Sequence, residues 1–128
     1  MCVALSAAPQ PSALEHADIH GTNVLTANGR CRLIDWGDCC ITHPFAALFV
    51  PIQFVVASLP TAARPAAARR LRDCYLEPWG GPTRDNLDLI DWALAIAPLV
   101  RVLSLAAESD SEPEITALLR AWVATPPR

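Results

Sequence analysis

The sequence contains no lysine, so all ten of its basic residues are arginines. Glycine is also scarce: the chain has five, Gly21, Gly29, Gly37, Gly80 and Gly81. None of them forms the glycine-rich loop that, together with a lysine, cradles nucleotide phosphates in many enzymes. The sequence therefore excludes a complete nucleotide site of that type within these 128 residues.

Strong charge imbalance and a secretion signal are absent as well. The net charge is −3 and the isoelectric point about 5.5, so nothing points to a nucleic-acid partner. Met1–Ala8 lacks the basic start and long apolar core of a secretory signal. The five cysteines are odd in number and irregularly spaced. We interpret them as reduced thiols in a cytoplasmic protein.

Residues 39–63 contain no Asp, Glu, Lys or Arg. An uncharged run of this length overlaps the range of membrane-spanning helices, about 17–25 residues. Three prolines, His43 and Gln53 interrupt it. We therefore expect no membrane span but a buried helix that begins near Pro44, with His43 or Thr42 as its cap.

The stretch from His16 to Asp38, HADIHGTNVLTANGRCRLIDWGD, carries the polar residues that matter most. Asn-Gly readily closes a hairpin, because both residues tolerate positive φ. This pattern predicts two short strands, Val24-Leu25 and Cys31–Ile34, joined at Ala27–Gly29. The hairpin would bring Asp18, Asn23 and Asp35 together at its open end, as an oxygen-ligated metal requires.

The motifs His16-x-Asp18-x-x-x-x-Asn23 and Asp35-Trp36-Gly37 resemble the phosphotransferase family of aminoglycoside phosphotransferases and choline and homoserine kinases. This family has a protein-kinase-like fold. The resemblance implies that Asp18 is the catalytic base and that Asn23 and Asp35 hold Mg²⁺ on ATP. No residue is assigned to binding the nucleotide itself. An alternative is that these polar side chains form only an Asx-turn and loop hydrogen bonds.

The chain departs from the family pattern at three positions. After the Asp-Trp-Gly motif the family continues Asp-Pro-x-x-Asp-Leu, whereas this chain has His43 and Ala47 in place of the two acids. The second acid normally supports the catalytic loop from below, so its loss is expected to leave the loop less well held. Ala17 stands where the family has glycine.

The rest of the chain is predicted to be mainly helical. We expect a loose lead-in over residues 1–13 and one lobe over 14–128, with the catalytic loop and metal hairpin in 14–38 and the helical part in 39–125. Helices are expected at Ala66–Leu76, at Arg84–Ala107 with a kink at Pro98, and at Glu112–Ala124 with a core stripe. That stripe comprises Ile115, Leu118, Leu119 and Trp122. The predicted fold is mainly α with a small β-hairpin: the C-terminal lobe of a kinase-like fold without its N-terminal lobe.

Other polar groups have simpler explanations than ligand binding. Cys31, Cys39, Cys40 and His43 lack the paired spacing of structural zinc sites, so we expect buried free thiols. His16 and His20 flank Asp18 and could suggest metal-dependent hydrolysis, but a packing role for His16 is preferred. Two charged clusters are interpreted as a solvated helix face and as favourable helix-start charges, rather than as phosphate or substrate ligands. They are Arg69, Arg70 and Arg72, and Asp85, Asp88 and Asp91.

The resemblance implies ATP- and Mg²⁺-dependent phosphoryl transfer to a small-molecule hydroxyl in a complete enzyme. The alternative is a truncated, inactive relic or interaction module of the same family, which the missing lysine and Ala47 favour. Since helices that normally precede the catalytic loop are absent, we also expect exposed apolar surface and self-association or a missing partner lobe.

Overall fold

The computed structural model describes residues 2–108, 116 and 120. Its helices and strands follow the order α1 (Cys2–Ser6), β1 (Ala13–Glu15), β2 (Val24–Ala27), β3 (Arg30–Leu33), β4 (Cys40–Thr42), α2 (Phe49–Ser58), α3 (Arg64–Leu76) and α4 (Arg84–Glu108). Single 3₁₀ turns lie between them at Gly21–Asn23, Pro44–Leu48, Thr61–Ala63 and Glu77–Trp79. The fold is mostly helical with two small antiparallel sheets, β1–β4 and β2–β3.

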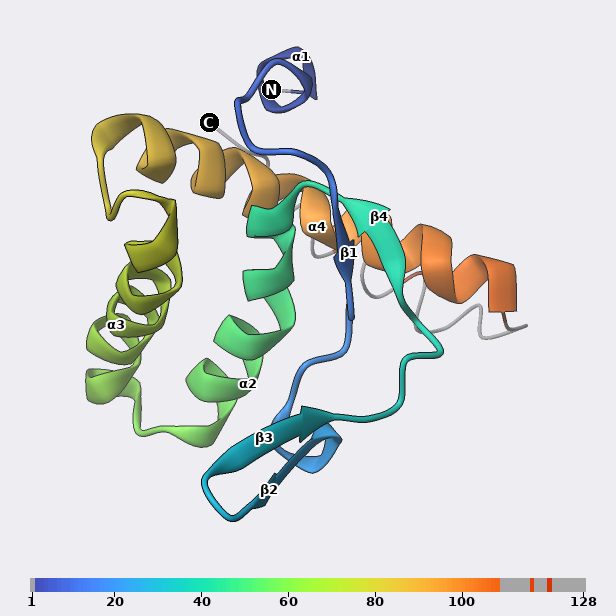
Figure 1. The fold of residues 1–128 in the computed structure, drawn as a ribbon, viewed down its shortest axis with the longest axis vertical. Coiled ribbons are helices and arrows are strands. Elements are labelled where there is room, and N and C mark those ends of the chain that lie inside the picture. Colours follow the sequence, from blue (N-terminus) through green and yellow to red (C-terminus); the bar gives the residue numbers. More distant parts are fainter. Residues whose placement is uncertain (1, 109–115, 117–119, 121–128) are drawn as a thin grey trace.

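The hairpin β2–β3 projects from one end of the molecule, and α1 lies at the opposite end (Figure 1). The loop of this hairpin consists of Asn28 and Gly29 alone, since Ala27 pairs with Arg30. Both loop residues have positive φ, 52° and 71°, which is the twist that two-residue hairpins favour. The predicted hairpin is therefore confirmed, although β3 ends at Leu33 rather than Ile34.

The second sheet joins the strand before His16 to the strand after Cys39. Ala13, Leu14 and Glu15 pair with Thr42, Ile41 and Cys40. Strand β4 was not predicted, because it lies at the start of the uncharged run, just before the helix expected from Pro44. The sheet closes the stretch from His16 to Cys39 into a loop with fixed ends (Figure 1).

The core lies where the turn after β4 meets α4. Phe45 and Leu48 from the Pro44–Leu48 turn pack with Leu76, at the end of α3, and with Ile90 of α4. Tyr75 contacts the Phe45 ring and its hydroxyl donates to the Pro44 carbonyl at 2.6 Å. These contacts anchor the segment that follows the Asp-Trp-Gly motif.

Three expectations about the helices need correction. The lead-in is not wholly loose: α1 forms, because Leu5 is apolar and is buried in the core. The run after Pro44 begins as a 3₁₀ turn, with the His43 side chain as its cap, and only this turn is buried. Helix α2 has no fully buried residue. Helix α4 begins at Arg84 as predicted, ends at Glu108 rather than Ala107 and includes Pro98; the kink at Pro98 stays a prediction. Of the predicted helix Glu112–Ala124 only Thr116 and Arg120 are described, and its core stripe lies outside the described residues.

Several large apolar side chains are exposed, some of them in the uncharged run of residues 39–63. Leu14 and Ile41, which pair across β1 and β4, are 59% and 71% exposed. Leu25, Trp36 and Phe54 are exposed near the hairpin. The large apolar side chains of α4 up to Val102 are at least partly buried. Exposure of apolar surface is thus confirmed, while self-association stays a prediction.

No helix in the described part of the chain is both long and apolar enough to cross a membrane.

Candidate active site

Asp18 and Asn23 are in direct contact at the base of the hairpin. The Asn23 amide nitrogen donates to both the backbone oxygen and the Oδ2 atom of Asp18, each at 3.0 Å. Asn23 is 7% exposed. Since its nitrogen faces Asp18, its amide oxygen faces the other way. The arrangement fixes the Asp18 carboxylate and leaves an oxygen of the kind that Mg²⁺ prefers.

His16 connects the two halves of the stretch. Its Nε2 donates to the Ile34 carbonyl at 2.8 Å, and its Nδ1 accepts from the Asp18 N–H at 3.4 Å. The ring also lies against Trp36, with centroids 4.7 Å apart. His16 is buried. The preferred packing role for His16 is therefore what the contacts show.

Asp35 follows Ile34, whose N–H donates to the Asn23 carbonyl at 3.1 Å. This bond continues the β2–β3 pairing by one step, so that Asp35 directly follows the residue bonded to Asn23. Asp35 has φ 63° and is exposed. Asp tolerates this left-handed conformation better than most residues, because its short side chain can bond locally. This positive φ turns the backbone away from the direction of β3 at Asp35, where the sequence predicts a metal ligand.

Ala17 also has a positive φ, 62°. The left-handed region costs an L-residue such as alanine about 1–2 kcal/mol. The loop is thus strained here and must be held by its neighbours. Ala47, which stands where an acid was expected, has no polar side-chain atom that could hold this loop.

Arg101 of α4 supplies a contact that the sequence analysis missed. Its Nη2 lies 3.5 Å from Asp18 Oδ1, and its Nη1 donates to Asp38 Oδ2. One signal could have found it: Arg101 is the only charged residue between Trp92 and Ala107. A lone cation in such a run is expected to seek carboxylates.

His20 completes the ring of groups around Asp18. Its Nε2 lies 3.1 Å from Asp18 Oδ2, and its Nδ1 accepts from the Thr22 hydroxyl at 2.9 Å. The Phe54 ring of α2 stacks on it, with centroids 5.9 Å apart. His20 is therefore positioned to orient the carboxylate.

The other predicted clusters do not converge on this site. Within residues 2–108, 116 and 120, no group of three or more His, Cys, Asp or Glu side chains is arranged to hold a metal ion. The expectation of buried thiols is wrong for Cys31 and Cys39, which are exposed, because the hairpin and its exit have little structure packed over them; Cys40 is half-buried. Arg69, Arg70, Asp85, Asp88 and Asp91 are exposed, as solvated helix faces should be.

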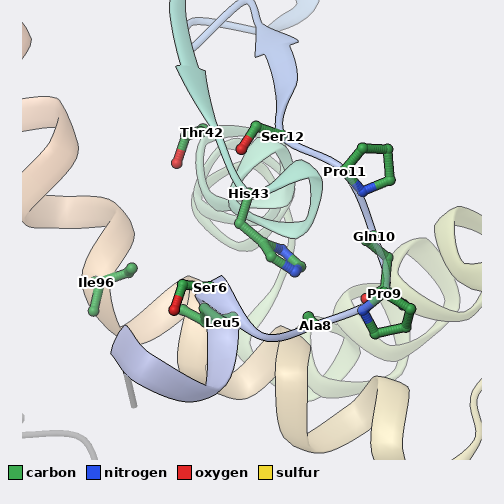
Figure 2. A pocket seen from close by; sticks show the side chains of 10 residues that line it. All are labelled: Leu5, Ser6, Ala8, Pro9, Gln10, Pro11, Ser12, Thr42, His43 and Ile96. Carbon is green, nitrogen blue, oxygen red and sulfur yellow. The ribbon is translucent and has the colours of Figure 1, made fainter.

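A cavity of about 420 Å³ lies away from Asp18, between α1 and the segment leading to β1 (Figure 2). Two buried atoms at its edge, His43 Nε2 and Gln10 Oε1, have no partner in the described structure. His43 Nδ1 accepts from Phe45 N–H, so Nε2 is a donor; burial lowers the pKa of His43 and keeps it neutral. One water can pair a donor with an acceptor, so these atoms do not require a ligand.

Glu15, which precedes His16, is buried in the sheet β1–β4. Burial raises the pKa of its carboxyl from 4.5 to about 7. Its Oε2 has no partner in the described structure. Cys40 and Tyr75, whose own pKa values are raised first by burial and then by the Glu15 charge, are its titratable neighbours.

This raised pKa predicts a pH-dependent stability. Between about pH 4.5 and 7 the folded protein keeps a proton that the unfolded chain has lost, so the free energy of unfolding falls as pH rises, by about 2–4 kcal/mol in total. Glu15→Gln should remove this fall. Urea unfolding at pH 5 and pH 8 measures it, with exposed Glu77→Gln as the matched control. An equal fall in the free energy of unfolding from pH 5 to pH 8 in wild type and in Glu15→Gln would contradict the raised pKa of Glu15.

A family model matches the part of the chain that contains the candidate site. The model of the phosphotransferase enzyme family matches residues 2–90, more than half of the chain. The chain belongs to this family. No curated protein and no solved structure matches it. The matched range contains Asp18, Asn23 and Asp35 but ends before Arg101.

Proposed function

We propose that this phosphotransferase-family chain carries the catalytic loop and metal hairpin of an enzyme that transfers the γ-phosphate of ATP to a small-molecule hydroxyl. The observation that supports it most directly is the Asp18–Asn23 contact, which presents a carboxylate and an amide oxygen at one end of the hairpin. In this proposal the chain forms the C-terminal lobe of a kinase-like fold.

In the proposed reaction Asp18 orients the acceptor hydroxyl and takes its proton. Asn23 and Asp35 would hold Mg²⁺, which supplies positive charge to the transferring phosphate. Their oxygens suit this hard cation. His20, Asn23 and Arg101 hold the Asp18 carboxylate in place. His16 holds the loop against the strand that leads to Asp35.

A second candidate is a non-catalytic member of the family that serves as an interaction module. The absence of lysine and of a glycine-rich phosphate loop in these 128 residues favours it. The exposed Leu14–Ile41 pair on the sheet β1–β4 also suits a surface that binds another protein.

The metal site can be tested without activity. Mn²⁺ titrated into the ¹⁵N-labelled chain should broaden the NMR signals of Asn23 and Asp35 first, because both would provide ligands. Asp35→Ala should abolish this broadening, since it removes the charged ligand and leaves a neutral amide. Asp85→Ala, an exposed acid at the start of α4, is the matched control and should change nothing. Equal broadening in wild type and Asp35→Ala would remove Asp35 from the metal site.

A further inference from the structure

Arg101 ties the helical part of the chain to the candidate catalytic loop. It lies on α4, 83 residues beyond Asp18 and 63 residues beyond Asp38. Its side chain is 17% exposed, and those of Asp18 and Asp38 are 24% and 21% exposed. The three groups are thus partly withdrawn from water. Ion pairs of this kind are held more firmly than those on an open surface.

The chemistry of arginine suits a bridge between two carboxylates. A guanidinium is planar and presents its two Nη groups in a rigid fork. Here Nη1 bonds to Asp38 and Nη2 faces Asp18. A lysine ammonium is a compact point charge on a flexible stem and does not reproduce this fork. The single positive charge of Arg101 lies between two carboxylates and reduces the repulsion between them.

The bridge completes the fixation of the Asp18 carboxylate. Asn23 and His20 bond to Oδ2, and Arg101 is the partner of Oδ1. The carboxylate is therefore held through both oxygens, by groups from the loop and from a distant helix. A cavity of about 10 Å³, roughly one water in size, lies beneath the loop between Ala17 and Arg101. Packing alone thus leaves the strained Ala17 turn incompletely supported.

We propose that Arg101 is a positioning residue: by binding Asp18 and Asp38 at once, it fixes the catalytic loop and the segment after Asp35 relative to each other before any substrate binds. The effect of this positioning on phosphoryl transfer rests on the function proposed above. The contacts of Arg101 with Asp18 and Asp38 do not depend on that function. Arg101 acts through Asp18 and is not itself assigned to the reacting atoms.

The 128-residue chain without metal or nucleotide is sufficient for the test. Amide hydrogen exchange by NMR should be compared in wild type, Arg101→Met, Arg101→Lys and Asp38→Asn. The amides of Asp18, Asn23 and Ile34, each hydrogen-bonded within the loop, should exchange roughly 10- to 100-fold faster in Arg101→Met, the usual weight of hydrogen bonds to charged groups. Arg101→Lys should fall between wild type and Arg101→Met. Arg72→Met, which breaks an ion pair with Asp73 on α3, is the matched control and should match wild type.

A spectroscopic signature separates positioning from general stability. The imidazole nitrogen signals of His20 and His16 should shift in Arg101→Met, because both rings contact the loop that Arg101 holds. Those of His43, which caps a turn away from this loop, should not. Combining Arg101→Met with Asp38→Asn should add little to Arg101→Met alone, since both changes break the same bridge.

Wild-type exchange rates and imidazole signals in Arg101→Met would overturn the proposal. If Arg101→Met does not fold, Arg101→Lys decides: its loop must still exchange faster than wild type, and wild-type behaviour overturns the proposal again. The proposed function fails separately, if Mn²⁺ leaves the Asn23 and Asp35 signals of the wild-type chain unchanged. A normal Mn²⁺ response with an unchanged loop in Arg101→Met would reject the positioning role alone.

Discussion

Asp18→Asn should lower phosphoryl transfer by roughly 10²- to 10⁴-fold, the usual contribution of a positioned general base. The change keeps the size of the side chain and its bonds to donors such as Asn23 and His20. It removes the charge that accepts the hydroxyl proton. Mg·ATP affinity should remain nearly intact, because Asn23 and Asp35, rather than Asp18, are the proposed metal ligands. The effect should therefore appear in turnover and not in the KM for ATP.

The measurement requires an active form, made by fusing a related N-terminal lobe to this chain. Asp73→Asn is the matched control, because it makes the same chemical change on α3, where Asp73 pairs with Arg72. Its turnover should equal that of the parent. Near-normal turnover in Asp18→Asn would show that the base lies elsewhere and that the Asp18–Asn23 contact is only structural.

The hairpin that forms part of this site could be predicted from short-range sequence patterns. Asn28-Gly29 specified a two-residue hairpin because both residues accept positive φ. That turn determines the pairing of Val24 with Leu33, which brings Asn23 beside Ile34. The His43 cap and the range of α4 also depend on nearby residues. Interactions within about ten residues were thus readable from sequence.

The contacts between distant segments were not readable in the same way. β4 pairs with β1 across more than twenty residues, and its three residues, Cys40–Thr42, are too few to establish an alternating pattern in the sequence. Arg101 reaches Asp18 across 83 residues. Only the cost of leaving a charge unpaired in an apolar helix could have indicated that Arg101 needs a partner. That argument predicts a partner but not which one.

Helix α2 shows how composition can mislead. Its sequence is apolar and uncharged, which predicted burial, yet its residues are half-buried or exposed. The core is filled instead by the short turn before it, whose Phe45 contacts Tyr75 and Trp79. An apolar sequence indicates that a segment can be buried, but its packing partners decide which part of the segment is buried.

The chain of 128 residues alone should transfer no phosphate at a useful rate. Catalysis of phosphoryl transfer depends almost wholly on positioning and on charge stabilisation of the phosphates. The chain has no lysine and no glycine-rich phosphate loop. The described cation at the candidate site, Arg101, is already paired with Asp18 and Asp38. Mg²⁺ on Asn23 and Asp35 would then face a nucleotide that little else holds.

Purified chain incubated with labelled ATP, Mg²⁺ and a panel of amino alcohols and aminoglycosides should give no labelled product. Asp18→Asn, prepared in parallel, identifies any contaminating kinase, because contamination would persist in that variant. Turnover in the usual kinase range, about 1–100 s⁻¹, that is lost in Asp18→Asn would contradict the prediction. The phosphates would then have to be held by arginines of this chain, and Arg101 would have to exchange its carboxylates for phosphate during the reaction.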